Sequence, residues 1–396
     1  MEKDPVRAAI RSMDQGPFRQ SSGGFRPTEA SVEVINEFGD PTLIGKCHRQ
    51  CWYRLKGYER TETLEDNTFV LWEVGKAMEE ALQMHWNRMG ILIDGNVRLG
   101  GNIADEGEVE IVMSGEVDAL IRDYEPDDRG KPVTIHTDKG IGIECKTVRG
   151  YGARKIMGGK KQLYKNGLPK WEAVLQTAMY LRNRKKLEDY YGIKIDYFII
   201  TYVAVDMSTF KSFIVRLEDG YSGRIIVTDI HGNELTPSME YALHKGVDVE
   251  KIQGMTIEEI IRRYRVLQDK LESDEPPERE FDLRYSDAKA KRLFETGMMS
   301  KTAYKRFTDN ELAEEGDWQC RYCDFKSECL PLGVLSSAVD DGQLTEAEAM
   351  DMMGYGGIAL PVAKTPKKVK MTDDEIIDAA LSKTGEGEVD NVNPSE

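Results

Sequence analysis

The pattern of apolar and polar positions predicts a strand-rich middle with helices around it. Short runs rich in apolar and β-branched residues indicate strands, and they lie at Ile91–Leu99, Glu108–Met113, Gly115–Arg122, Gly140–Lys146, Tyr197–Val205 and Thr209–Leu217. The turns expected between the first four runs lie at Gly100-Gly101, Ser114-Gly115 and Glu125–Lys131. Because Tyr197–Val205 is almost entirely apolar, we expect a strand buried on both faces, with Thr209–Leu217 as its hairpin partner.

Apolar residues spaced three or four apart predict four helices. They are Thr28–Gly39, Leu71–Met89, Trp171–Lys186 and Ile257–Leu271. The first begins at a typical N-cap residue and ends at a glycine, which favours a helix there.

Composition divides the chain into a core and two appendages. Residues 1–28 are rich in Gly, Ser, Arg and Gln and hold few apolar residues, which is typical of a flexible arm. After Leu332 we expect an acidic helix, a linker, a helix with a capping box and an acidic tail, the first three at Ala338–Met353, Gly354–Met371 and Thr372–Lys383. The expected domains are an arm at 1–28, a core at 29–332 and a C-terminal appendage at 333–396.

Charge and hydropathy exclude two broad classes of protein. The 396 residues carry a formal net charge of −16, which argues against a chain that coats nucleic acid with uniform positive charge but allows a local basic track. No apolar run approaches the ~20 residues of a membrane span, and residues 1–15 lack the apolar stretch of a secretory signal. We therefore expect a soluble, cytoplasmic protein with no membrane partner.

Two of the predicted strands carry a cluster of charged residues. Asp118 lies in one strand, and Glu144 and Lys146 lie two apart in another, so they share one face while Cys145 points to the other. Buried carboxylates are costly without a cation, and their oxygens suit Mg²⁺ or Mn²⁺. The pattern predicts a divalent-metal site in which Lys146 orients water or stabilises charge on a phosphate. Surface ion pairing is the alternative.

Two of the predicted helices add polar residues. Gln176 and Tyr180 are four apart and lie on one helix face, which for these two alone favours a polar stripe beside the core. Glu79 follows Gly75 in the helix Leu71–Met89 and, taken alone, is typical of a solvated surface residue.

The cysteines indicate a metal site rather than disulfides. The chain has six, namely Cys47, Cys51, Cys145, Cys320, Cys323 and Cys329. The last three form a C-x2-C-x5-C group, which needs a fourth thiol, from Cys47 or Cys51, to close a four-cysteine site. Such a site would join the two ends of the core, and its spacing suits either zinc or an iron–sulfur cluster. We expect Cys145 to be a small buried core residue.

The order of the charged and polar residues resembles the RecB-like branch of the PD-(D/E)XK nucleases. The matching residues are Gly75, Glu79, Asp118, Glu144, Lys146, Gln176 and Tyr180. The resemblance implies that Asp118 and Glu144 bind the metal, that Lys146 is the catalytic lysine, and that Gln176 and Tyr180 help to hold the site and the DNA.

The third metal ligand is where the chain departs from this family. Many members have a histidine at the position of Glu79. A carboxylate there still suits a divalent ion, and Glu80 and His85 are the alternatives.

The cysteine pattern is similar to that of the iron–sulfur nucleases of the same group, which include the CRISPR-associated exonucleases and the AddAB-type nuclease domain. In those proteins one cysteine precedes the nuclease motifs and three follow. The Cys-His-Arg-Gln-Cys-Trp-Tyr run that starts at Cys47 resembles their Cys-Pro-Arg-x-aromatic start, without the proline and with Cys51 at the aromatic position. The resemblance implies a [4Fe–4S] cluster, rather than zinc, on Cys47, Cys320, Cys323 and Cys329.

The resemblance covers residues 40–332 and implies an α/β fold. We expect a central mixed β-sheet flanked by helices, as in restriction endonucleases, with a helical portion that carries the iron–sulfur cluster.

The stretch between Lys146 and Trp171 is basic in an otherwise acidic chain. It has no acidic residue but has Arg149, Arg154, Lys155, Lys160, Lys161, Lys165 and Lys170. We expect a mobile, glycine-rich loop that gathers phosphates beside the metal, with Tyr151, Tyr164 and Trp171 available to stack on bases. A solvated surface loop is the alternative. A second basic stretch, Lys289–Arg306, is a candidate exit path for DNA near the cluster.

The resulting expectation is a Mg²⁺- or Mn²⁺-dependent deoxyribonuclease. The resemblance implies an exonuclease that acts on DNA ends, with a preference for single strands, in recombination, repair or phage genome processing. A recombination or helicase partner, in a bacterial cell or a phage-infected host, would fit that role. The alternatives are a catalytically silent module that binds DNA ends and a zinc-stapled scaffold with no role on DNA. No feature indicates the base-specific readout of a restriction enzyme.

Overall fold

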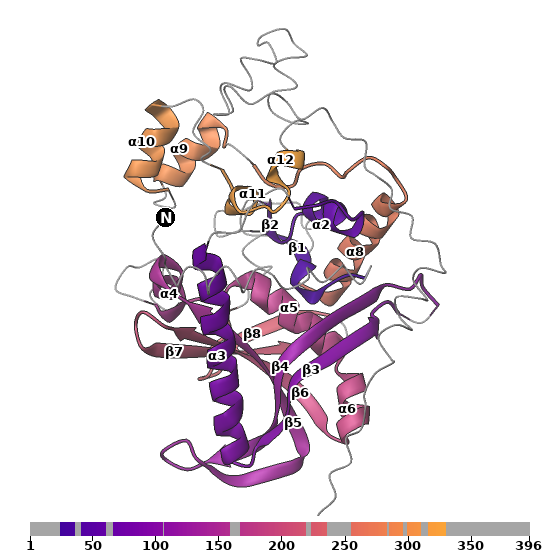
Figure 1. Cartoon of the computed structure of the whole chain (residues 1–396), viewed down its shortest axis with the longest axis vertical. Coiled ribbons are helices and arrows are strands. Elements are labelled where there is room, and N and C mark those ends of the chain that lie inside the picture. Colours follow the sequence, from indigo (N-terminus) through magenta and orange to yellow (C-terminus); the bar gives the residue numbers. More distant parts are fainter. Residues whose placement is uncertain are drawn as a thin grey trace, which may run out of the picture. The chain divides into compact units, whose positions relative to one another are not determined.

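The computed structural model describes part of the chain. The described residues are 24–35, 41–60, 66–105, 107–158, 167–218, 223–235, 255–282, 285–295, 299–309 and 316–329. Every described residue belongs to one compact unit within Met1–Gln343 (Figure 1). Most of the predicted arm, residues 1–23, and the elements predicted beyond Leu332 lie outside the described residues.

A mixed sheet of six strands forms the centre of the described unit. In spatial order its strands are β3 (Leu92–Asn102), β4 (Val112–Pro126), β5 (Pro132–Val148), β6 (Lys194–Ala204), β7 (Thr209–Leu217) and β8 (Ile225–Asp229). Neighbouring strands are antiparallel except β5 and β6. That pair is parallel because a long crossover joins them, which carries α4 (Gly150–Met157), α5 (Trp171–Arg182) and α6 (Lys185–Tyr191).

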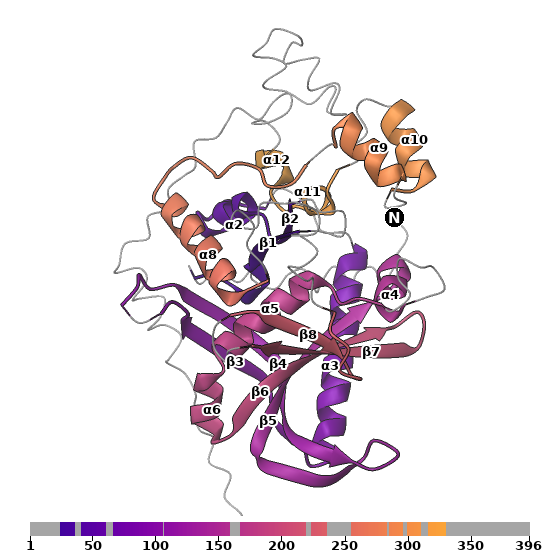
Figure 2. The same cartoon turned by 180° about the vertical axis from the view of Figure 1, so that it is seen from behind.

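Helices cover the two faces of this sheet unequally. α3 (Asp66–Arg88) lies on one face, where Leu82 and Trp86 pack against the buried residues of β4 and β5. α5 lies on the other face and is buried throughout residues 173–181. Figure 1 shows α3 in front of the sheet, and the reversed view in Figure 2 shows α5 in front. On β6, fully buried residues alternate with half-buried ones, so the prediction that Tyr197–Val205 is buried on both faces is wrong for one face.

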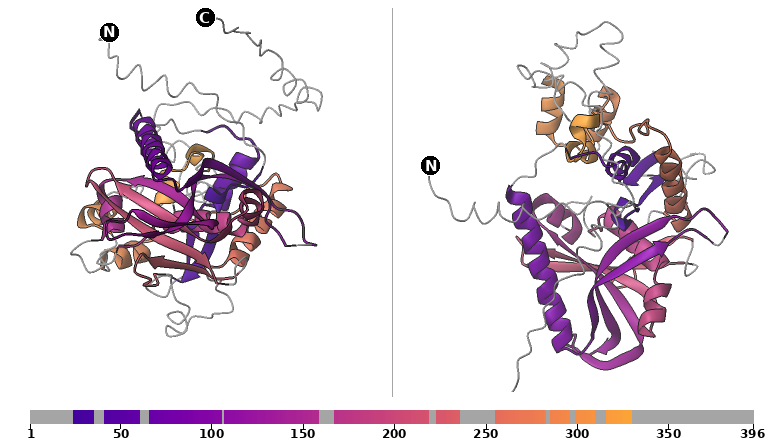
Figure 3. Two further views of the ribbon diagram at one scale, coloured as in Figure 1. Left: turned by 90° about the horizontal axis from the view of Figure 1, so that it is seen from below. Right: turned by 45° about the vertical axis from the view of Figure 1, so that its right-hand side comes forward.

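The remaining elements form a second cluster beside the sheet. They are η1 (Pro27–Glu29), β1 (Ser31–Ile35), β2 (Pro41–Gly45), α2 (His48–Leu55), α8 (Ile257–Leu271), α9 (Asp287–Glu295), α10 (Lys301–Asp309), α11 (Trp318–Arg321) and α12 (Lys326–Cys329). α2 and α12 touch through Tyr53, whose ring lies 5.7 Å from that of Phe325 and whose hydroxyl donates to the Glu328 carbonyl at 3.2 Å. Figure 3 shows α2, α11 and α12 at the end of the unit opposite the β4–β5 turn.

The expected fold class is confirmed at the level of a mixed α/β fold with a central mixed sheet flanked by helices. β7 and α8 have the predicted bounds, and the helix predicted at Leu71–Met89 forms most of α3. The helix predicted at Trp171–Lys186 divides into α5 and α6, with the break after Arg182.

The helix predicted at Thr28–Gly39 is wrong. Pro27–Glu29 forms a short 3₁₀ turn and Ser31–Ile35 forms β1, while residues 36–40 lie outside the described residues. Val32 and Val34 are both buried with Glu33 between them, so the burial has the period of two that belongs to a strand.

Two expected turns and part of one expected strand are also wrong. Gly100-Gly101 lies inside β3, Ser114-Gly115 lies inside β4, and residues 108–111 precede β4. The chain reverses between these strands at Asn102, whose side-chain oxygen accepts from the backbone N–H groups of Ala104 and Ile111, both at 3.0 Å. Gly115 serves close packing instead, because a Cβ there would lie 3.1 Å from the Tyr180 ring.

Candidate active site and cysteine site

Strand register brings three of the predicted site residues together. Ala119 of β4 pairs with Ile143 of β5, and Asp118 and Glu144 are the next residues on the two strands beyond this pair. The backbone N–H of Cys145 donates to Asp118 Oδ2 at 2.6 Å. Lys146 Nζ forms an ion pair with Glu144 Oε1. Two carboxylates and an ammonium therefore lie together where the two strands join.

α5, which packs on one face of the sheet, holds the Glu144 carboxylate by hydrogen bonding. Gln176 Nε2 donates to Glu144 Oε1 and to the Tyr180 hydroxyl oxygen, both at 2.8 Å. The Tyr180 hydroxyl donates in turn to the Glu116 carbonyl at 2.7 Å. Glu144 is 1% exposed, and its Oε2 has no hydrogen-bond partner among the described residues. One buried carboxylate oxygen is thus left able to accept a cation or a donor.

α3 brings Glu79 close enough for its charge to interact with Asp118 and Lys146. Glu80 and His85, the alternative third ligands, are both exposed. Gln83, one turn beyond Glu79, donates to the Asp118 carbonyl at 2.7 Å and so ties α3 to β4. The sequence prediction missed Gln83, although its spacing of four from Glu79 places both on one helix face.

The electrostatics of this group show an excess of negative charge. Burial, and then the neighbouring Glu144 carboxylate, raise the pKa of Asp118 to about 7. Burial and Asp118 raise the pKa of Glu79 to about 7, and burial raises the pKa of Glu144. For Lys146, burial acts to lower the pKa, but the carboxylates of Glu144 and Asp118 outweigh it and the pKa is raised. Three carboxyl groups thus face one ammonium group.

The donor chemistry of this group fits a hard divalent cation. As the side chains stand, no three His, Cys, Asp or Glu residues in the described part of the chain are arranged to hold a metal ion. All the candidate ligands are nevertheless carboxylate oxygens, which Mg²⁺ and Mn²⁺ prefer. Glu144 Oε2 is buried without a hydrogen-bond partner among the described residues, and a divalent ion would balance the surplus charge.

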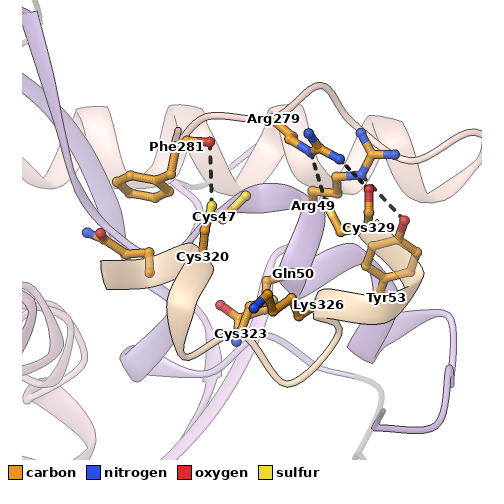
Figure 4. A pocket seen from close by; sticks show the side chains of 11 residues that line it. Cys47, Arg49, Gln50, Tyr53, Arg279, Phe281, Cys320, Cys323, Lys326 and Cys329 are labelled. Atoms are coloured by element: carbon orange, nitrogen blue, oxygen red, sulfur yellow. Dashed lines mark hydrogen bonds between the residues drawn. The ribbon is translucent and has the colours of Figure 1, made fainter. Parts of the chain in front are cut away.

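Four of the six cysteines line one cavity at the far end of the unit (Figure 4). Cys47 precedes the first turn of α2, Cys320 lies in α11, Cys323 lies between α11 and α12, and Cys329 ends α12. The other two cysteines belong to the hydrophobic core, where Cys51 is 2% exposed and Cys145 is 5% exposed. Of the two candidates for a fourth thiol, the structure therefore places Cys47 in the cavity.

The cavity combines buried thiols with cationic side chains. Burial raises the pKa of Cys47, that of Cys320 to about 12 and that of Cys323 to about 11. The cations on the cavity wall are Arg49, Arg279 and Lys326. A bound metal or cluster would overcome the cost of ionising the thiols, because metal binding displaces thiol protons. Thiols are the donor type that both zinc and iron–sulfur clusters use, although as the side chains stand no three of the described cysteines are arranged around one ion.

The basic stretch after Lys146 begins as a helix, so the expected loop is wrong for residues 150–157. These residues form α4 because Ala153 and Ile156, three apart, are buried against the core. The basic and aromatic side chains placed at the surface are Arg149, Tyr151, Arg154, Lys155 and Lys170. Trp171 is partly buried. Lys160, Lys161, Tyr164 and Lys165 lie outside the described residues.

The second basic stretch, Lys289–Arg306, falls largely on α9 and α10. Three of its four lysines are paired with acids, namely Lys289 with Asp282 and Asp317, Lys291 with Glu295, and Lys305 with Asp309. This pairing reduces the field that the stretch offers to a phosphate backbone.

Comparison with known proteins does not identify a family. No family model matches the chain, and no curated protein matches it. A solved structure titled "Crystal structure of SSO0001" is similar at 14% identity and a TM-score of 0.34, over 83% of this chain and 97% of that one. A similarity this distant carries no argument about the fold or function of this chain. No helix in the described part of the chain is long and apolar enough to span a membrane.

Proposed function

We propose that the chain is a metal-dependent deoxyribonuclease with a centre of the PD-(D/E)XK type. The observation that supports this most is that Asp118, Glu144 and Lys146 lie together on the paired strands β4 and β5. The buried Glu144 Oε2, which has no hydrogen-bond partner among the residues that the structure describes, and the surplus negative charge add to it. The motif order, which resembles the RecB-like nucleases, is a separate line of support.

Each residue has a chemical task in this proposal. Asp118 and Glu144 would hold the ion, with Glu79 as the third carboxylate. The bound ion would lower the pKa of water and neutralise charge on the phosphate. Lys146 adds a fixed positive charge for the phosphate oxygens. Gln176 donates to Glu144 at 2.8 Å and holds it in place, and Tyr180 accepts from Gln176 at 2.8 Å and so orients that amide.

The reaction is hydrolysis of a DNA phosphodiester. The oxygen of water forms a bond to phosphorus, the bond from phosphorus to one ester oxygen breaks, and that oxygen takes up a proton. Exposed Arg149, Arg154 and Lys155 on or beside α4 follow the catalytic strand directly, so they suit the phosphates that flank the cleaved bond. Action on DNA ends with a preference for single strands follows from the resemblance.

Digestion of end-labelled single- and double-stranded DNA with Mg²⁺ or Mn²⁺ tests the proposal. We expect Asp118→Asn and Lys146→Ala each to lower the rate by about 100-fold or more. Glu125→Gln is the matched control, because Glu125 is an exposed carboxylate on the same strand as Asp118 and should leave the rate unchanged. Wild-type protein that binds DNA ends without cleaving them would indicate the silent end-binding module instead.

We further propose that Cys47, Cys320, Cys323 and Cys329 hold a [4Fe–4S] cluster. Their shared cavity supports this, since it joins α2 to α11 and α12. Iron and acid-labile sulfide analysis of anaerobically purified protein tests it. About four iron and four sulfide per chain are expected, whereas one zinc per chain with no iron would support the zinc-stapled alternative.

A further inference from the structure

A short segment, residues 279–282, contacts every element that carries a cavity cysteine. Arg279 Nε donates to Cys329 Sγ at 3.2 Å, and its Nη2 donates to the Cys329 carbonyl. The Cys320 thiol donates to the carbonyl of Phe281 at 3.5 Å, as Figure 4 shows. The backbone N–H of His48, next to Cys47, donates to Glu280 Oε2 at 2.7 Å.

The 279–282 segment is itself fixed to the rest of the unit. Its last residue, Asp282, exchanges two hydrogen bonds with Asp317, the N-cap of α11, at 2.7 and 2.8 Å. Glu280 Oε1 accepts from Arg263 of α8 at 2.6 Å. Pro276 and Pro277 precede the segment, and proline restricts the backbone in the unfolded and folded chain alike. The segment is therefore a firm support for the cavity wall.

Arg279 of this segment places its guanidinium group against the sulfur of Cys329. A guanidinium group can only donate hydrogen bonds, so the Cys329 sulfur is the acceptor in its contact with Arg279 Nε. Contact with both the sulfur and the carbonyl of one residue also fixes the position of that sulfur. Arg49, on the same cavity wall, instead donates to the Tyr53 hydroxyl at 3.4 Å.

We propose that Arg279 fixes the position of the Cys329 sulfur as a ligand and supplies positive charge that raises the reduction potential of the proposed iron–sulfur cluster. A nearby cation stabilises the reduced cluster more than the oxidised one, because reduction adds a negative charge. This inference rests on the proposed cluster and is independent of the nuclease activity.

The test compares full-length wild-type protein with Arg279→Gln, Arg279→Lys and Arg49→Gln, all purified anaerobically. The measurements are the half-time of cluster loss in EDTA and the midpoint potential from a dithionite titration followed by electron paramagnetic resonance. In Arg279→Gln we expect a more negative midpoint potential and cluster loss about 10-fold faster. Arg279→Lys should keep a potential near that of wild type but lose the cluster faster, because one ammonium cannot make both contacts. Arg49→Gln should change both quantities less than Arg279→Gln.

Three results would overturn the inference. One is an Arg279→Gln cluster with the potential and half-time of wild type. Another is an equal shift of the midpoint potential in Arg49→Gln, which would show that Arg279 has no greater effect than another cation on the cavity wall. The third is wild-type protein that holds zinc and no iron. If Arg279→Gln does not fold, Arg279→Lys still tests the inference, because a wild-type half-time of cluster loss in that variant would contradict the role of the two contacts with Cys329. A failed DNA digestion with an intact cluster would count against the nuclease alone.

Discussion

The carboxylate site and the cysteine site are built in opposite ways. Asp118, Glu144 and Lys146 lie on two adjacent strands, so the register of one antiparallel pair brings them together. The four cavity cysteines lie near the two ends of the described sequence. Hydrogen bonds from the 279–282 segment hold the helices that carry them. Adjacent strands position the carboxylates of the first site, and α5 and α3 add Gln176 and Glu79. The second site depends on contacts between segments far apart in the chain.

The two sites also differ in the charged groups that line them. The carboxylate site has surplus negative charge, and burial raises the pKa values of its acids. The cysteine cavity has buried thiols with raised pKa values and three cations on its wall. The carboxylate oxygens of the first site are the donors that hard divalent ions prefer, and the thiols of the second are the donors that soft metals prefer.

The largest effect is expected from removing one cavity thiol, which should disturb the cysteine site and leave the carboxylate site in place. If the proposed cluster is present, Cys320→Ser should lose nearly all bound iron and lower the melting temperature, because the cluster would link α2 to α11 across the shared cavity. Cys51→Ser is the matched control, since Cys51 is buried in the core outside the cavity. It should keep the iron and lose about 1–3 kcal/mol of stability. Iron loss in Cys51→Ser with retention in Cys320→Ser would refute the assignment of ligands.

The next effect concerns the carboxylate site alone. Mg²⁺ or Mn²⁺ at about 100 times its dissociation constant should stabilise the wild-type chain by about 2.7 kcal/mol. Asp118→Asn should remove most of that gain while leaving the cluster absorbance intact, and calorimetric melting with and without the ion measures it. An undiminished gain in Asp118→Asn would place the ion elsewhere.

A smaller effect is expected in the pH dependence of the ion-free protein. The pKa of Asp118 rises from 3.8 to about 7, and that of Glu79 rises from 4.5 to about 7. The folded chain thus binds protons more tightly than the unfolded chain. The resulting contribution to the free energy of unfolding is full below about pH 4 and is lost as the pH rises to about 7. The effect is moderated because both carboxyls are partly exposed to solvent. Urea unfolding at several pH values should show a flatter profile in Asp118→Asn, and an equal slope in both proteins would contradict this.

The smallest effect tests the tie between α3 and the sheet. Gln83→Ala should cost about 1 kcal/mol, because it removes the hydrogen bond to the Asp118 carbonyl. It should also weaken Mg²⁺ binding, since Glu79 is on the same helix. Asn87→Ala, at an exposed position one turn further along α3, is the control. Equal Mg²⁺ affinity in the two variants would show that the tie does not position Glu79.

Local patterns predicted the sheet and the carboxylate site better than they predicted the cysteine site. The period of two placed Glu144 and Lys146 on one face, and the apolar spacing of three and four gave α8 its observed bounds. The same spacing misled at Thr28–Gly39, where pairing with β2 makes Ser31–Ile35 a strand. The cysteine spacing identified the thiols, but nothing in the sequence of residues 279–282 indicates that this segment supports the cysteine cavity. That role arises from contacts between segments far apart in the chain, which no local pattern encodes.

The most direct test of the central claim is an X-ray structure of the protein soaked in Mn²⁺, with anomalous scattering used to locate the ion. The account predicts an anomalous peak bound by carboxylate oxygens of Asp118 and Glu144, with Lys146 beside it. A well-occupied peak elsewhere, with these two carboxylates facing only protein groups, would contradict it.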